Sequence, residues 1–110
     1  MSNYIILKLS GKEIGIPFGN DKKLLEIANS QWRLTPAKLG NAKRALLLFR
    51  GQVLNEYEVD DQIIFDRQET KITFSMKTIK NSNYKNKVIN YKTPNRASII
   101  SKENLDQLIL

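Results

Sequence analysis

Two groups of residues combine positive charge with aromatic rings. Trp32 is the only tryptophan of the chain, and Arg33 follows it directly. The segment from Lys80 to Arg96 holds five Asn, four Lys, one Arg and two Tyr. Lys and Arg contact phosphates and aromatic rings stack on bases, so this composition is typical of a groove that binds nucleic acid. The residues expected to take part are Trp32, Arg33, Lys80, Tyr84, Lys85, Lys87, Tyr91, Lys92, Asn95 and Arg96.

The sequence contains a second basic cluster, and each of these groups also has a purely structural interpretation. Lys43 and Arg44, with Lys38, are expected on a helix, and Arg50 at a hairpin tip, where they could position phosphates or only form a solvated surface. Trp32 could equally seal a hydrophobic core, because tryptophan buries a large apolar area. The lysines of the loop could serve solubility alone.

The composition excludes several kinds of chemistry. The chain has no Cys and no His, which excludes disulfides, thiolate metal sites and His-based triads. We therefore expect no cofactor and no metal, and no catalytic activity of the protein's own.

The distribution of charge favours a polyanionic partner, with DNA or RNA as the first candidate. The net charge is +7. It divides into +6 for Met1 to Val53, −5 for Leu54 to Thr70 and +6 for Lys71 to Leu110. Such blocks predict a basic surface crossed by an acidic stripe, and binding by one face.

Three alternatives to simple binding remain open. Asp61, Glu69 and Lys71 resemble the acid, acid-x-Lys arrangement of nucleases that use a divalent metal. A small ribosome-directed toxin could cleave RNA with Lys, Arg and Tyr in place of His. A protein-binding inhibitor would present its charged faces to a protein partner.

Length and hydropathy predict one domain over residues 1–110. The longest apolar run, Ala45 to Phe49, is five residues, whereas a membrane span needs about 20. We therefore expect no membrane contact and a cytoplasmic location.

Periodicity and turn residues predict the order of the elements. The strongest signal is a strand pair, Ala45 to Phe49 and Val53 to Val59, with Val53, Tyr57 and Val59 facing together. The other expected elements are an opening hairpin of Tyr4 to Leu9 with Glu13 to Phe18, a helix capped by Asn20 or Asp21, a helix from Thr35-Pro36 to Arg44, strands Ile63 to Phe65 and Lys71 to Met76, a basic loop, and a closing helix capped by Ser101. The predicted core contains Ile6, Ile16, Leu25, Leu47, Phe49, Val53, Tyr57, Ile72, Phe74 and Leu105.

The segment from Leu24 to Tyr57 has a recognisable sequence of features. An apolar helix is followed by Trp32-Arg33-Leu34, the run Ala42 to Ala45, an apolar strand and Gly51. This resembles small bacterial PUA-like domains related to the ASCH and EVE domains. In those domains a tryptophan follows the first helix, and a strand leads through a glycine turn into a returning strand.

A fainter similarity continues through Thr73-Phe74 and Lys92 to Arg96. There the PUA-like domains carry an Asn-Pro-x-Arg-like turn, and this chain has Pro94-Asn95-Arg96. The resemblance implies an α+β fold, a small mixed β-barrel with short helices at its ends, and the binding of nucleic acid or a modified base. It also implies that the loop lies over the helix junction, which predicts a specificity pocket between Trp32 and the Lys80–Arg96 segment.

Overall fold

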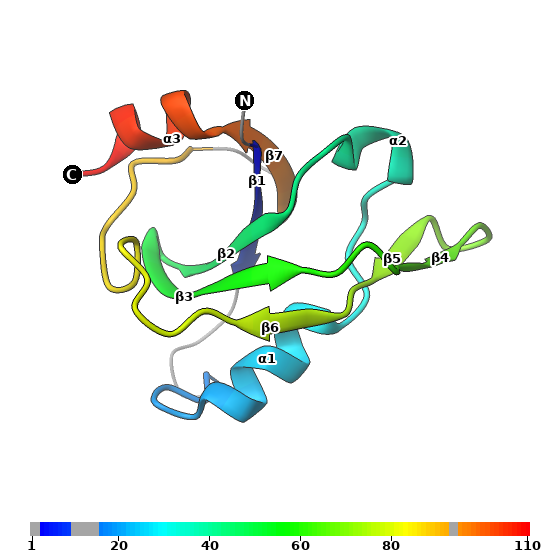
Figure 1. Cartoon of the computed structure of the whole chain (residues 1–110), viewed down its shortest axis with the longest axis horizontal. Coiled ribbons are helices and arrows are strands. Elements are labelled where there is room, and N and C mark those ends of the chain that lie inside the picture. The colour runs from blue at the N-terminus through cyan, green and yellow to red at the C-terminus, as the bar shows by residue number, and fades with distance from the viewer. Residues whose placement is uncertain (1–2, 10–15, 93–94) are drawn as a thin grey trace.

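The protein is built on a mixed β-sheet with a helix on each side (Figure 1). The computed structural model describes residues 3–9, 16–92 and 95–110. In chain order the elements are β1 (Asn3–Leu9), α1 (Asp21–Asn29), α2 (Pro36–Leu39), β2 (Arg44–Phe49), β3 (Gln52–Val59), β4 (Ile64–Asp66), β5 (Lys71–Thr73), β6 (Met76–Thr78), β7 (Ala97–Ser101) and α3 (Lys102–Leu108).

Strands β1 and β2 lie inside a five-stranded sheet of order β6-β3-β2-β1-β7. They run parallel to each other, and the other neighbouring strands are antiparallel. Tyr4 to Leu7 of β1 and Ala45 to Phe49 of β2 are all buried. Consecutive apolar residues of this kind are expected where both faces of a strand are covered.

The opening hairpin expected from the sequence is wrong. Strand β1 pairs with β2 on one side and with β7 on the other, so neither edge is left for a hairpin partner. Of the expected second strand, Glu13 to Gly15 lie outside the described residues, and Ile16 to Phe18 form a bend and a turn. The partner is β7, which the sequence analysis missed.

Two hydrophobic clusters fill the two sides of the sheet. Leu24 and Ala28 of α1 belong to the first cluster, and Leu105 of α3 belongs to the second. Figure 1 shows α1 and α3 on opposite sides of the strands. Of the predicted core, Ile16 and Leu25 are only half-buried. The other eight are buried as predicted: Ile6, Leu47, Phe49, Val53, Tyr57, Ile72, Phe74 and Leu105.

The predicted β2–β3 hairpin is confirmed, but its facing pattern is not. Its tip, Arg50-Gly51, has positive φ at both residues, the pattern of a type I′ turn. The pairing register shifts between Leu47 and Leu48 of β2, where β3 has one extra residue and forms a bulge. Val53 therefore packs in the second cluster while Tyr57 packs in the first. Tyr57 and Val59 share the first cluster as predicted, and the expectation that Val53 faces with them is wrong.

The helix caps are as predicted, and the second helix is shorter than predicted. The Asn20 side chain accepts a hydrogen bond from the N–H of Lys23 at the start of α1. At α3 the Ser101 hydroxyl accepts one from Asn104. The helix expected to reach Arg44 ends at Leu39, because Gly40 turns the chain with φ of 54° and Arg44 already belongs to β2.

The predicted strand from Lys71 to Met76 is divided. Its first part pairs with β4 in a separate two-stranded sheet, which projects at the right of Figure 1. Its last residue begins β6, at the edge of the large sheet. Ile72, Phe74 and Met76 are nevertheless all buried, as the alternation predicted.

The α+β class is confirmed. Among the described strands, β6 and β7 are the edge strands of the large sheet and do not pair with each other, so a closed barrel is not confirmed. None of the helices in residues 3–9, 16–92 and 95–110 has the length and apolar character that crossing a membrane requires.

Candidate functional site

A cleft lies between two segments that are far apart in the sequence. One wall is Ser30–Leu34, which follows α1, and the other is Asn95–Ile99, which leads into β7. Its volume is about 700 Å³, within the range of pockets that hold small ligands. We call it the Trp32 cleft, and it is completed by Leu9, Ile27, Lys38 and Lys71.

Four hydrogen bonds hold Trp32 at this cleft, and in one of them its carbonyl oxygen accepts from the N–H of Leu34 at 2.9 Å. The main chain of Trp32 exchanges two with Ile72, of 2.9 and 2.8 Å, and its indole Nε1 donates to the carbonyl oxygen of Ala28 at 3.0 Å. The residue is only 5% exposed and packs in the first hydrophobic cluster. Both sequence interpretations of Trp32 thus describe part of its position: it is a core residue that also borders a cleft.

The charge of the cleft is positive. Arg33, Lys38, Lys71 and Arg96 border it, and none of the described residues that line it is acidic. No ion pair within the described part of the chain involves any of these four cations. Because nothing there neutralises them, they create a positive potential at the opening.

Arg96 lies over the ring of Trp32. The carbon at the centre of its guanidinium group is 6.0 Å from the ring centroid, a distance at which cation–π attraction acts. An exposed planar cation is therefore held over a buried aromatic ring, and a guanidinium plane is a surface on which nucleobases stack.

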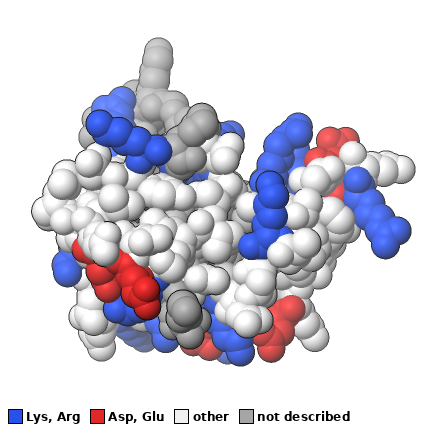
Figure 2. All heavy atoms as spheres, turned by 90° about the horizontal axis from the view of Figure 1, so that it is seen from above, with Lys and Arg blue, Asp and Glu red and all other residues white. Residues whose placement is uncertain are grey.

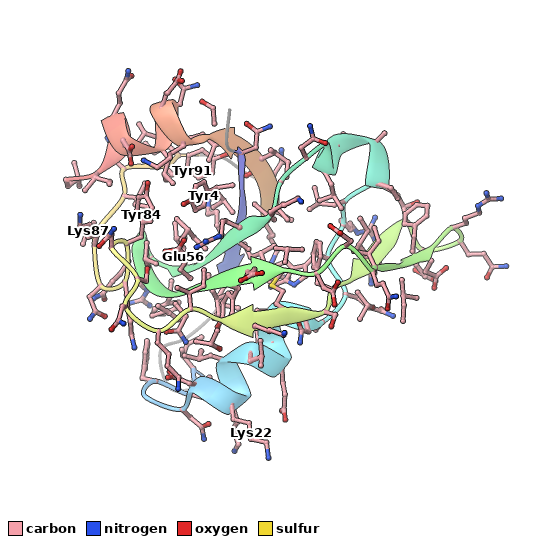
Figure 3. All side chains as sticks on the ribbon, viewed as in Figure 1. Tyr4, Lys22, Glu56, Tyr84, Lys87 and Tyr91 are labelled. Atoms are coloured by element: carbon pink, nitrogen blue, oxygen red, sulfur yellow. The ribbon has the colours of Figure 1, made fainter. Side chains whose placement is uncertain are left out.

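A second group of functional side chains surrounds Glu56 on β3. We call it the Glu56 cluster. Glu56 is 4% exposed and accepts hydrogen bonds from Ser82 at 2.6 Å, Arg44 at 3.2 Å and Tyr4 at 3.4 Å. Figure 3 shows Tyr4, Glu56 and Tyr84 gathered between the strands and α3, with Lys22 far away on α1. The remaining members are Tyr84, Lys102 and Asp106, and together they border a hollow of about 310 Å³.

Tyr84 and Asp106 extend this network toward α3. The Tyr84 hydroxyl donates to Asp106 at 2.6 Å, and the Lys102 ammonium group donates to the same carboxylate at 3.0 Å. Burial, and then the hydrogen bond to Asp106, raise the pKa of Tyr84. The bonds from Tyr84 and Lys102 lower the pKa of Asp106. Each carboxylate of the cluster is thus occupied by donors of the protein itself.

The structure brings Trp32, Arg33, Asn95 and Arg96 together, and these last two are the only described residues of the Lys80–Arg96 segment that line the cleft. Thr93 and Pro94 of the same turn lie outside the described residues. Tyr84 is 6% exposed, with its ring edge-on against Tyr4 at 5.4 Å, so its faces are covered by the protein. The Tyr91 hydroxyl contacts that of Ser98 at 2.7 Å.

The other predicted basic residues are dispersed. Lys43 borders a small hollow with Glu58 and Asp60, and Arg50 lies over the ring of Phe49 at 5.0 Å. Figure 2 shows the Lys and Arg side chains of one face in separate groups, with acidic groups among them. Arg44 and Lys87 border the Glu56 hollow, and Lys80, Lys85 and Lys92 are exposed on the loop.

Asp61 and Lys71 of the nuclease alternative line different hollows. Asp61 borders the same hollow as Lys43, whereas Lys71 borders the Trp32 cleft. In the described ranges no three acidic side chains lie close enough to hold a metal ion.

The sequence analysis missed Tyr4, Glu56, Ser82 and Asp106. Glu56 occurs in the run Glu56-Tyr57-Glu58, which suggests two exposed acids flanking one buried ring. Burial of Glu56 depends on loop 79–87, which is distant in sequence, and on Arg44, which was expected on a helix. Ser82 was the one available signal in the sequence, because serine favours turns in which its hydroxyl bonds to nearby main-chain N–H groups. In the structure its hydroxyl accepts from the N–H groups of Tyr84 and Lys85.

Comparisons with protein-family models, with curated proteins and with solved structures found no match to this chain.

Proposed function

We propose that this protein is a nucleic-acid-binding module that uses the Trp32 cleft and has no catalytic step of its own. The observation that carries the proposal is the charge of the lining, with four cations and no acidic residue. Phosphate contacts by Lys and Arg supply most of the affinity of such modules, because binding releases counterions from the nucleic acid.

The cleft also has surfaces that suit a base. Ile27, Leu34 and Ile99 give it apolar walls, and Gln31 adds an amide of the kind that both donates and accepts hydrogen bonds. Apolar walls with a few polar groups are the usual composition of a ligand pocket. The PUA-like resemblance implies the same class of partner, and the proposal does not depend on it.

The test is a titration with labelled oligonucleotides at several salt concentrations. We expect the double variant Arg33→Ala with Lys71→Ala to bind more weakly at low salt than the unmodified protein. Each phosphate contact of a single strand contributes about 0.7 to the slope of log affinity against log salt, so the slope should fall by about 1.4.

The matched control is Lys80→Ala with Lys85→Ala, which removes the same charge from exposed positions outside the cleft. If both double variants change the slope equally, binding is a property of total charge and the cleft has no special role. If no oligonucleotide binds at low salt, the proposed function is wrong.

A further inference from the structure

Strand β7 is the last strand of the large sheet, beside β1. In the described part of the chain no strand pairs with its outer side. The main-chain N–H and C=O groups on such an edge are available to a ligand.

The register shows which groups face outward. The N–H of Lys8 donates to the carbonyl oxygen of Arg96 at 2.7 Å, and Leu7 lies opposite Ala97. Directly opposite residues of an antiparallel pair alternate between bonded and non-bonded pairs. The N–H and C=O groups of Ser98 therefore point toward β1, and those of Ala97 and Ile99 point to the outer edge.

This edge forms part of the Trp32 cleft. Ser98 lies opposite Ile6, whose side chain is in the second cluster, and its hydroxyl contacts that of Tyr91, which packs on that cluster. Its side chain is thus directed to the face away from Ala97 and Ile99, whose hydrophobic side chains pack in the first cluster. Ser98 nevertheless lines the cleft. Since its side chain is held elsewhere, its main chain must border the cleft.

We propose that the Trp32 cleft binds single-stranded nucleic acid and that the outward main-chain groups of Ala97 and Ile99 pair with the edge of one unpaired base. In an extended strand the N–H and C=O groups of one residue point to the same side, so that a donor lies next to an acceptor. The Watson–Crick edge of every base carries such a pair. This inference rests on the proposed function and adds the kind of strand and the groups that read it.

Charge favours a nucleic acid over an extended peptide as the occupant. A single strand carries one negative charge for each nucleotide, which suits four cations that form no ion pair with any residue in the described part of the chain. A duplex is a poor fit, because its Watson–Crick edges are already paired and its grooves are read by side chains that project from a protein surface.

The protein variant that tests this is Ile99→Pro. Proline removes the N–H that points outward and no hydrogen bond to β1, and edge strands accept proline at such positions. Ile99→Ala is the matched control, because it also loses the isoleucine side chain but keeps the N–H. We expect Ile99→Pro to bind a short single strand at least tenfold more weakly than Ile99→Ala, with an unchanged salt slope.

A ligand test on the unmodified protein is independent of folding of the variants. A nine-nucleotide single strand in which every position is abasic keeps every phosphate and removes every base. We expect it to bind tenfold or more weakly than the same strand with its bases, and we expect weaker binding of the matching duplex.

Equal binding of Ile99→Pro and Ile99→Ala when both are folded overturns the role of the main chain. Equal binding of the abasic strand and the strand with bases, or of duplex and single strand, overturns the proposed binding of an unpaired base. In each case salt-dependent binding that persists leaves the proposed function intact. Binding of an acidic peptide, with no binding of oligonucleotides, would refute both.

Discussion

The Trp32 cleft and the Glu56 cluster contain similar residues but differ in how their charges are neutralised. In the Glu56 cluster, Arg44 and Lys102 are paired with carboxylates at 3.2 and 3.0 Å. In the Trp32 cleft, four cations border an opening whose lining contains no acid. The first arrangement satisfies its own hydrogen bonds, whereas the second leaves charge for a ligand.

This difference shows why composition alone does not identify a binding surface. Tyr84 and Arg44 have the types expected in a nucleic-acid groove, yet their polar groups bond to Asp106 and Glu56 of the same protein. A buried polar group without a partner carries a large desolvation penalty, so such networks are usually closed. We therefore expect the cluster to govern stability and the cleft to govern binding.

The largest effect is expected from Trp32→Ala, which should lower the free energy of unfolding by about 3–5 kcal/mol. The side chain is buried in the first cluster, and its removal leaves a cavity. Urea denaturation measures the loss. Trp32→Phe keeps most of the packing and loses only the bond to Ala28, so a much smaller change is expected. Equal losses for the two variants would contradict this explanation.

Glu56→Ala should come next, with a loss of about 3 kcal/mol. It leaves the Arg44, Ser82 and Tyr4 donors without their common acceptor. The same denaturation experiment measures it, and the salt slope of oligonucleotide binding should not change. A change of slope without a loss of stability would assign the cluster to binding and remove the contrast between the two regions.

Two arginine variants compare the regions directly. Arg44→Ala should lower the free energy of unfolding by about 1–2 kcal/mol, because Glu56 loses a charged donor, and should leave binding unchanged. Arg96→Ala, on an exposed residue of the cleft, should weaken binding about tenfold and change stability by less than about 0.5 kcal/mol. The reverse assignment of the two effects would refute the comparison.

The smallest effect concerns pH. Hydrogen bonds from Tyr84 and Lys102 lower the pKa of Asp106. A carboxyl group with a lower pKa in the folded state stabilises the protein above its unfolded pKa of about 3.9, and this stabilisation disappears as the pH falls through the folded value. Asp106→Asn should therefore flatten the loss of stability on acidification. Glu26→Gln, an exposed acid of α1, is the control and should leave that profile unchanged.

Local features of the fold were predictable from neighbouring residues. The Asn20 and Ser101 caps, the β2–β3 hairpin and the burial of Ile72, Phe74 and Met76 depend on short-range geometry and alternation. The site was predictable in part. Trp32 was identified because it is the only tryptophan and lies beside an arginine, and the resemblance brought the turn at Asn95 and Arg96 near it.

The sequence by itself determined the α+β class, the helix starts, the strongest hairpin and the excess of positive charge, because each depends on residue types or on neighbours a few positions apart. Only the tertiary structure decided that β1 pairs with β2 and β7, because strands about 40 and 95 residues away compete for its edges without a local signal. It also decided that Tyr84 and Glu56 face inward. Whether a charge or a ring is available to a ligand depends on the partners that the fold brings to it, and those partners come from distant parts of the chain.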